Sequence, residues 1–243
     1  MNNYEYCAEW ARTEAAGRDV RILDYGCGAG QTVALLRAAG SDAYGCDVFF
    51  EGNDYSTQVP TEFFGTIIRR MQHGVIPFES GSFDLLINNF VMEHVSDFET
   101  ALDEIHRVLK PGGVALNMFP DRNVWMENHC RIPFLHRFPK GSRPRVYYAA
   151  ALSFLGVGAR VPPEAALPWS ERICRWLDDW TFYRTDAEIR HAYGSRFTRV
   201  TDIEEQWLRA RFGARVQMAY MLPVAVQRYL VRRIGSLAFT CQK

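Results

Sequence analysis

The chain has 243 residues, 48% of them hydrophobic, and its 28 basic and 28 acidic side chains give a formal net charge of zero. This length favours one domain with a large insertion over two independent domains, and the apolar content suffices for a sizeable core. No apolar run reaches the ~18 residues of a membrane span, and residues 1–10 lack the basic and apolar regions of a signal peptide.

The cysteines oppose both a disulfide-stabilised protein and a protein with a cysteine metal site. None of the six belongs to a C-x-x-C pair or has the spacing of metal ligands. We therefore expect reduced thiols, no disulfide framework and no metal site, as in a cytoplasmic protein.

Charge divides the chain into two unequal halves. Residues 1–120 carry 8 basic and 17 acidic side chains (8 − 17 = −9), and residues 121–243 carry 20 and 11 (20 − 11 = +9). An arginine-rich surface accounts for the basic half, and an anionic ligand or an acidic membrane surface is the alternative. We expect no nucleic-acid partner, because no basic stripe carries interleaved stacking aromatics.

The first predicted elements are a helix over residues 3–17, a buried strand at Val20–Leu23 and a helix over residues 31–39. Asp24 and then three glycines at alternate positions lie between that strand and the second helix: Gly26, Gly28 and Gly30. Glycines at such a turn allow positive φ and let a ligand touch the backbone, and the helix start offers unpaired N–H groups. The pattern predicts a nucleotide-type binding loop, with the helix over residues 3–17 lying over its mouth.

The spacing of these glycines opposes a nicotinamide-dependent reductase. The dinucleotide fingerprint G-x-G-x-x-G needs a third small residue, and counting from Gly26 that position is Gln31. Here the spacing is G-x-G-x-G, with an acidic residue two positions before the first glycine.

Further strands are predicted near residues 42–47, 66–71, 83–88 and 113–119, with helices between them. This alternation indicates a parallel sheet with helices on both faces, which binds its ligand at the carboxyl ends of the strands. The second strand ends at Asp47, whose carboxylate can accept both hydroxyls of a ribose.

Three later segments follow in a recognisable order: Ile76–Asn88 (IPFESGSFDLLIN), Val91–Val95 (VMEHV) and Glu104–Gly113 (EIHRVLKPGG). Together with the glycine loop, they resemble the motifs of class I S-adenosylmethionine-dependent methyltransferases of the small-molecule "type 11" branch. The resemblance covers residues 20–119. It implies a Rossmann-like, seven-stranded, mostly parallel sheet, with strands also at 197–202 and 237–242, the last one antiparallel.

The resemblance also implies S-adenosylmethionine as cofactor, S-adenosylhomocysteine as product, and a set of cofactor-binding residues. Gly26, Gly28 and Gly30 would form the cradle, Asp24 would orient the loop or the methionine ammonium, and Asp47 would bind the ribose. Gln72 occupies a position near the adenine amine where the family often has an acidic residue. Asn89 and Phe90 would line the methyl end.

After Phe119 the pattern changes, and we expect the single domain to carry an inserted helical cap, residues 120–184, over the acceptor site. Thr185 then begins a helix with Glu188 at the capping-box position. Residues 203–234 form a second, arginine-rich helical insertion. Its apolar side chains can lie on a membrane surface or pack on the core: Trp207, Leu208, Phe212, Val216, Met218, Tyr220, Met221 and Leu222.

Methyl transfer requires alignment of the acceptor with the methyl group, which lowers the activation barrier by roughly 7–11 kcal/mol. For an oxygen acceptor it also requires a base, which raises the rate by about 10²–10⁴-fold. His94 is the first candidate for this base, because its motif position is near the acceptor and histidine titrates near neutral pH. Its alternative role is to orient the loop or to start the helix at Asp97. His129, with Glu127, is the second candidate, and both can equally be structural. Three residues could contact the acceptor: Tyr147, Tyr148 and Arg184.

The sequence thus predicts O-methylation of a small molecule or glycan, which could be anionic. The segment Ile132–His136 is similar to caps of methyltransferase-like proteins from bacterial polysaccharide pathways, which favours the glycan. The alternative is a non-catalytic protein that binds S-adenosylmethionine as a partner or sensor.

Overall fold

The computed structural model describes residues 1–52, 54–160, 163–213 and 221–243. A seven-stranded sheet with the order β3-β2-β1-β4-β5-β9-β8 lies at its centre. Only β9 runs antiparallel to its neighbours, β5 and β8, which confirms the predicted fold class. The strands are β1 (Arg21–Tyr25), β2 (Asp42–Asp47), β3 (Ile68–Arg70), β4 (Phe83–Asn89), β5 (Leu109–Phe119), β8 (Arg199–Asp202) and β9 (Leu237–Gln242).

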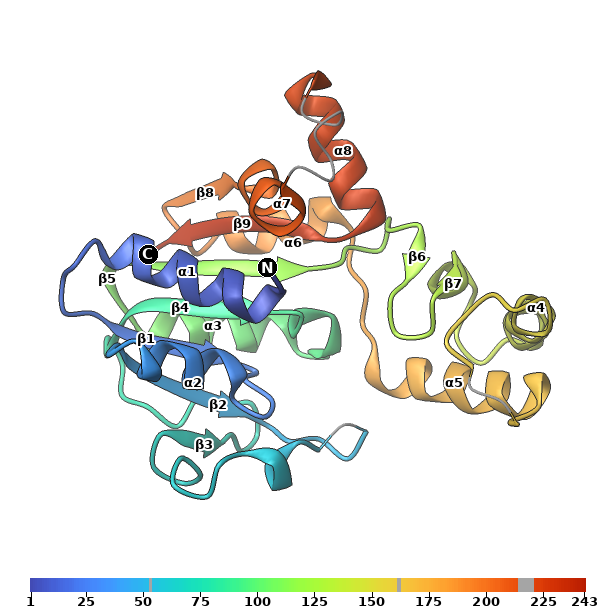
Figure 1. Cartoon of the computed structure of the whole chain (residues 1–243), viewed down its shortest axis with the longest axis horizontal. Coiled ribbons are helices and arrows are strands. Elements are labelled where there is room, and N and C mark those ends of the chain that lie inside the picture. Colours follow the sequence, from blue (N-terminus) through green and yellow to red (C-terminus); the bar gives the residue numbers. More distant parts are fainter. Residues whose placement is uncertain (53, 161–162, 214–220) are drawn as a thin grey trace.

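Helices cover both faces of this sheet (Figure 1). The helices of the described residues are α1 (Asn3–Ala15), α2 (Gln31–Ala38), α3 (Phe98–Val108), α4 (Arg143–Phe154), α5 (Ala166–Trp180), α6 (Asp186–Gly194), α7 (Glu204–Phe212) and α8 (Val224–Ile234). Of these, α4 and α5 lie apart from the sheet (Figure 1). On one face, α3 and α6 bury Ile105, Ile189 and Tyr193 against the strands. On the other, α1, α2 and α7 bury their apolar stripes, among them Leu36 and Trp207.

The capping box predicted at residue 185 is present. The Thr185 hydroxyl accepts a hydrogen bond from the Glu188 N–H at 3.3 Å, and the Glu188 carboxylate accepts one from the Thr185 N–H at 2.7 Å. These two bonds satisfy backbone groups that the first turn of α6 leaves unpaired.

Residues 120–184 form a region with its own small core, beyond the carboxyl ends of the central strands (Figure 1). It contains α4, α5 and a hairpin, β6 (Met126–Glu127) with β7 (Ile132–Pro133), that the sequence did not predict. Two-residue strands are too short to show a period in the sequence. The core of this region, called the cap below, consists of Cys130, Ile132, Leu135, Ala149, Trp169, Cys174 and Leu177.

The arginine-rich stretch before β9 forms α7 and α8. Trp207 and Leu208 are buried in the sheet core, so this part of the predicted apolar face packs on the protein itself. Val216, Met218 and Tyr220 lie outside the described residues, and contact with a membrane surface stays a prediction. Within the described ranges, no helix combines the length and apolar character needed to cross a bilayer.

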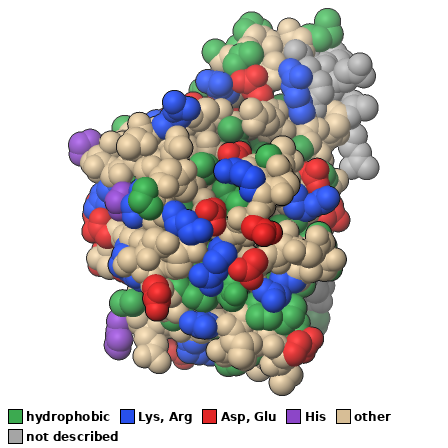
Figure 2. Space-filling view, turned by 90° about the vertical axis from the view of Figure 1, so that its left-hand side faces the viewer, with side chains coloured by type: hydrophobic (Ala, Val, Ile, Leu, Met, Phe, Trp, Pro, Cys, Tyr) green, Lys and Arg blue, Asp and Glu red, His purple; other side chains and the backbone are tan. Residues whose placement is uncertain are grey.

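Several arginines of the basic half form ion pairs with acidic side chains of the same half. Arg232 contacts Glu204 at 2.7 Å and Asp202 at 2.9 Å, and Arg228 contacts Glu205 at 3.1 Å. On the face shown in Figure 2, basic and acidic side chains are interspersed. These observations favour the structural explanation of the charge difference between the two halves.

Candidate active site

The glycine loop is tied to the neighbouring strand by its backbone. The N–H groups of Gly26 and Cys27 both donate to the Cys46 carbonyl of β2, at 2.8 and 3.1 Å, and the Gly30 N–H donates to the Cys27 carbonyl at 2.9 Å. Each of the three glycines has a positive φ, between 53° and 84°. The alternating glycines therefore allow β1 to turn sharply into α2.

The three glycines have two different steric roles. A Cβ on Gly26 would lie 2.3 Å from the Val91 side chain, and one on Gly30 would lie 2.3 Å from Ile68. A Cβ on Gly28 would meet only the Tyr55 ring, at 3.5 Å. Gly26 and Gly30 thus permit close packing inside the protein, whereas the backbone of Gly28 faces open space that a ligand can occupy.

A cavity of about 750 Å³ lies against this loop. Six of the eight residues predicted to bind cofactor line it: Asp24, Gly26, Gly28, Asp47, Asn89 and Phe90. Gly30 is outside the lining, and Gln72 is exposed to solvent although Met71 and His73 line the cavity. Asn2, Asn3 and Tyr4 also line it, so the start of α1 lies over the mouth, as expected.

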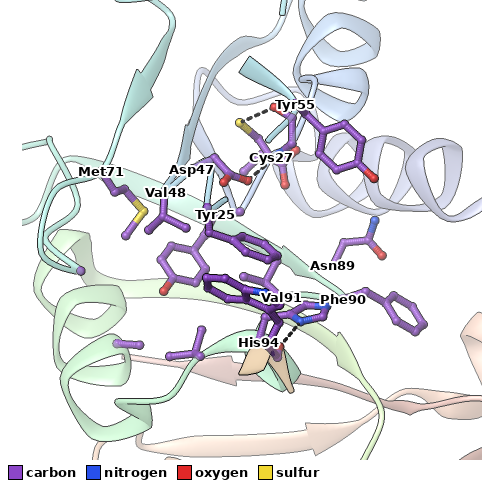
Figure 3. Close-up of a pocket in the computed structure, with 18 of the residues that line it drawn as sticks. Tyr25, Cys27, Asp47, Val48, Tyr55, Met71, Asn89, Phe90, Val91 and His94 are labelled. Carbon is purple, nitrogen blue, oxygen red and sulfur yellow. Dashed lines mark hydrogen bonds between the residues drawn. The ribbon is translucent and has the colours of Figure 1, made fainter. Parts of the chain in front are cut away.

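Asp47 is held rigidly at the end of β2. Its two carboxylate oxygens accept hydrogen bonds from the Phe49 N–H at 2.7 Å and from the Gly28 N–H at 2.9 Å. Burial raises the pKa of Asp47, and the two N–H bonds oppose this shift. Each oxygen has a second lone pair, so the carboxylate can still accept hydroxyls of a ligand. Figure 3 shows Asp47 beside Cys27 and Tyr55, on the side of the pocket opposite His94.

Asp24 lies at the bottom of the loop and is only 4% exposed. Burial raises its pKa to about 8; the Thr32 hydroxyl opposes this shift, and repulsion from Asp47 adds to it. A cationic group of a ligand beside Asp24 would favour the charged form and reverse this shift.

Phe90 marks the point where the chain leaves β4. It has a left-handed conformation, φ 59°, which is unfavourable for a bulky side chain. Its N–H donates to the Met118 carbonyl of β5 at 2.7 Å. This bond fixes the turn that brings Asn89 and Val91 to the cavity wall.

His94 and His129 lie side by side although they are 35 residues apart. Their Nε2 atoms are 3.2 Å apart. The Nδ1 atom of His94 is 2.6 Å from the Trp180 carbonyl oxygen, and the Nδ1 atom of His129 is 2.6 Å from Glu127 Oε1. The Tyr183 hydroxyl also donates to this carboxylate, at 3.0 Å. The structure thus brings together the two histidines that the sequence proposed separately.

The environment separates the pKa values of the two rings. Burial lowers the pKa of His94 to about 4, and the Trp180 carbonyl opposes the shift. Burial also acts to lower the pKa of His129, but the bond and the charge of Glu127 outweigh it and raise that pKa. The Nδ1 atom of His94 faces the Trp180 carbonyl and its Nε2 atom faces His129, so both ring nitrogens are in contact with groups of the protein itself. The geometry favours the alternative role of His94, which is to orient its loop.

The three residues suggested for acceptor binding do not line the cavity. The Tyr148 hydroxyl donates to the Pro133 carbonyl at 3.0 Å, and Tyr147 is exposed on α4. Arg184 donates to backbone carbonyls on both sides of the junction between cap and sheet, those of Phe182 at 2.8 Å and Val95 at 2.8 Å. These contacts indicate structural roles within the cap and at its junction.

Sequence reasoning missed three residues of this region. Trp180 and Tyr55 line the cavity, but they lie outside every motif and no local pattern marks them. Glu93 is buried directly beside His94, and burial raises its pKa to about 8. Its place inside the Val91–Val95 motif is the only signal that could have found it.

Comparison with known proteins shows what the part of the chain that carries the glycine loop resembles. Residues 23–117 match a family described as a methyltransferase domain. Over 104 residues the chain is 35% identical to the demethylmenaquinone methyltransferase of Staphylococcus aureus (strain MRSA252). The predicted resemblance to the S-adenosylmethionine-dependent methyltransferases is confirmed for this segment. The alignment covers 41% of this chain and 42% of the length of the relative.

Solved structures share the fold of nearly the whole chain. An S-adenosylmethionine-dependent methyltransferase from Mesorhizobium loti has a TM-score of 0.52 at 17% identity, over 99% of this chain and 100% of that one. The geranyl diphosphate C-methyltransferase of Streptomyces coelicolor A3(2) has a TM-score of 0.51 at 15% identity, over 98% and 75% of the two chains. At such identities the likeness shows the fold: a Rossmann-like sheet with helices on both faces.

Proposed function

We propose that this protein is an S-adenosylmethionine-dependent methyltransferase that acts on an oxygen of a small molecule or glycan. The observation that carries the proposal is the open backbone of Gly28 beside the carboxylate of Asp47, both on the wall of one cavity. S-adenosylmethionine, when bound, supplies an activated methyl group. The chain's own contribution is to bind the nucleoside, to align the reacting groups and to exclude water.

The residues around the cavity fit the parts of this cofactor. Asp47 would accept the ribose hydroxyls, and the backbone at Gly28 would contact the nucleoside. Asp24, buried beneath the loop, would face the methionine ammonium. Asn89 and Phe90, at the end of β4, would border the methyl group. Gln72 is exposed, so an adenine contact there would require its side chain to turn toward the cavity.

Space for an acceptor lies next to the methyl end. The cavity continues beyond the glycine loop to Val95, Ser96, Thr100 and the cap residue Trp180. This continuation favours an enzyme over a non-catalytic binding protein, which would need no such space. Small-molecule acceptors are also named for two similar proteins, the demethylmenaquinone methyltransferase and the geranyl diphosphate C-methyltransferase.

Calorimetry with S-adenosylhomocysteine and with NADH tests the choice of cofactor. We expect S-adenosylhomocysteine to bind with one-to-one stoichiometry and NADH to give no heat. Binding of NADH without binding of S-adenosylhomocysteine would overturn the proposal in favour of a reductase.

A screen of acceptors with methyl-labelled S-adenosylmethionine tests turnover. The panel should include phenols, hydroxy acids, sugar phosphates and oligosaccharides, with thiols and amines as controls for the acceptor atom. We expect label on an oxygen. Label on nitrogen, sulfur or carbon would keep the methyltransferase and reject O-methylation, and tight cofactor binding without any transfer would favour the sensor.

A further inference from the structure

Three potential metal ligands converge where the cap meets the methyltransferase domain. They are Glu93 and His94, in the 3₁₀ turn Met92–His94 after β4, and His129 in the β6–β7 hairpin. One ligand atom of each lies within 4.8 Å of the others. We propose that these residues bind a divalent transition-metal ion of the Zn²⁺ type, which links the cap to the sheet domain.

The two imidazole rings are arranged as metal ligands commonly are. Each Nδ1 atom faces an oxygen acceptor, the Trp180 carbonyl for His94 and the Glu127 carboxylate for His129. Both Nδ1 atoms therefore carry hydrogen, which leaves the two Nε2 lone pairs pointing at each other. Metal-binding histidines typically donate their second N–H to a carboxylate or a backbone carbonyl.

The separation of the two rings also matches a shared ion. Zn²⁺ binds imidazole nitrogen at about 2.0–2.1 Å, so two nitrogens on one ion are ~3.0 Å apart at a right angle and ~3.4 Å apart in a tetrahedron. The observed Nε2–Nε2 distance is 3.2 Å. A proton shared between the rings is the alternative explanation of this contact.

Glu93 supplies an independent observation that favours a cation. Its side chain is buried, with 3% exposure, and its Oε2 atom has no hydrogen-bond partner. A buried carboxyl oxygen without a partner is unfavourable. A metal ion between Glu93 and the two histidines would satisfy this oxygen, whereas a proton shared by the rings would not.

Two imidazoles and one carboxylate form a donor set that suits Zn²⁺, Fe²⁺, Co²⁺ or Ni²⁺ better than Mg²⁺ or Ca²⁺. This proposal departs from the expectation that the protein has no metal site. That expectation considered spacing along the chain, whereas these ligands come from two regions 35 residues apart.

Metal content and binding test the proposal on the untagged full-length protein. After a chelator has removed any bound metal and Zn²⁺ has been added back, we expect about one Zn²⁺ per chain by elemental analysis and calorimetry. Co²⁺ added instead should give a visible spectrum of nitrogen and oxygen ligation. Glu93→Gln, which keeps the side-chain shape, and His129→Ala should each weaken Zn²⁺ binding at least ~10-fold. His191→Ala is the matched control, because His191 is exposed on α6.

Thermal unfolding gives a second readout that does not depend on catalysis. Zn²⁺ should raise the Tm of the wild type and of His191→Ala, because it binds only the folded chain, and should raise the Tm of Glu93→Gln by less. A wild type that binds no stoichiometric Zn²⁺ or Co²⁺ would overturn the proposal and leave the shared proton. Equal Zn²⁺ affinities of the wild type and Glu93→Gln would show that the ion does not bind at this site, even if the protein binds metal elsewhere. Because these readouts need no acceptor, their failure is distinct from failure of the proposed methyl transfer.

Discussion

The glycine loop and the cluster of Glu93, His94 and His129 are built in different ways, although the loop and His94 line the same cavity. The loop consists of neighbouring residues, 24–30, fixed by hydrogen bonds to the next strand and by one carboxylate, Asp47. The cluster joins a turn after β4 to the cap hairpin and to the carbonyl of Trp180 at the end of α5. The loop thus depends on local backbone geometry, whereas the cluster exists only when the cap packs against the sheet domain.

Gly28→Val should have the largest effect on the loop. A side chain there would project into the cavity from a backbone with φ 53°, so we expect no measurable binding of S-adenosylhomocysteine by calorimetry. Gly112→Val is the matched control, because Gly112 also has a positive φ, 79°, but open space around it. The control should lose stability by about 1–2 kcal/mol from the left-handed backbone and keep its binding. Retained binding by Gly28→Val would show that no ligand approaches this backbone.

Leu177→Ala tests the cap, and asks whether it is built independently of the glycine loop. Leu177 is fully buried in the cap core, so the substitution should lower the free energy of unfolding by about 2–5 kcal/mol. Leu102→Ala, in the sheet core, is the matched variant. If the two regions are built independently, Leu177→Ala should leave the affinity for S-adenosylhomocysteine nearly unchanged once the protein is folded. A large loss of affinity at 10 °C, below the unfolding transition, would show that the cap helps to hold the loop.

Asp47→Ala should weaken binding of S-adenosylhomocysteine by ~1.5–3 kcal/mol, the usual contribution of hydrogen bonds to a charged group. The substitution also removes the acceptor for the N–H groups of Gly28 and Phe49. Asp42→Ala is the control, since Asp42 is exposed at the opposite end of the same strand and pairs only with arginines, the nearer being Arg21 at 3.3 Å. Equal dissociation constants for wild type and Asp47→Ala would remove the ribose assignment.

Asp24→Asn should have an effect on stability that depends on pH. In the folded chain the pKa of Asp24 is raised from 3.8 to about 8 by burial. Between these values the folded state holds a proton that the unfolded state has released, so Asp24 lowers stability as the pH rises from about 4 to 8. Asparagine does not titrate, so the Tm advantage of the variant should grow from pH 5 to pH 8.

One pKa unit corresponds to about 1.4 kcal/mol, or roughly 3–6 °C in Tm for a chain of this size. Differential scanning fluorimetry across that pH range measures the effect. A Tm difference that stays constant with pH would show that Asp24 is already ionised in the folded protein. If Asp24 faces the methionine ammonium, the same variant should bind S-adenosylhomocysteine more weakly, which would explain why a destabilising carboxyl is present.

The resemblance to the methyltransferase family implied the single antiparallel strand. The sequence by itself determined the parallel strands and the position of the cofactor loop. These features depend on short-range rules: apolar runs form strands, glycines allow a sharp turn, and an acidic residue ends the neighbouring strand. The sequence also marked Asp47 correctly as a residue of the cavity wall, because parallel strands bring their carboxyl ends to one edge.

Only the tertiary structure decided which glycine faces the ligand, that Gln72 points to solvent, and that His94 meets His129. Gly26, Gly28 and Gly30 look alike along the chain, and they differ only in what Val91, Ile68 and the cavity place beside them. The contact between the histidines depends on how the cap docks, through side-chain packing between segments far apart in sequence. No local pattern encodes that packing, because it depends on the shapes of both surfaces at once.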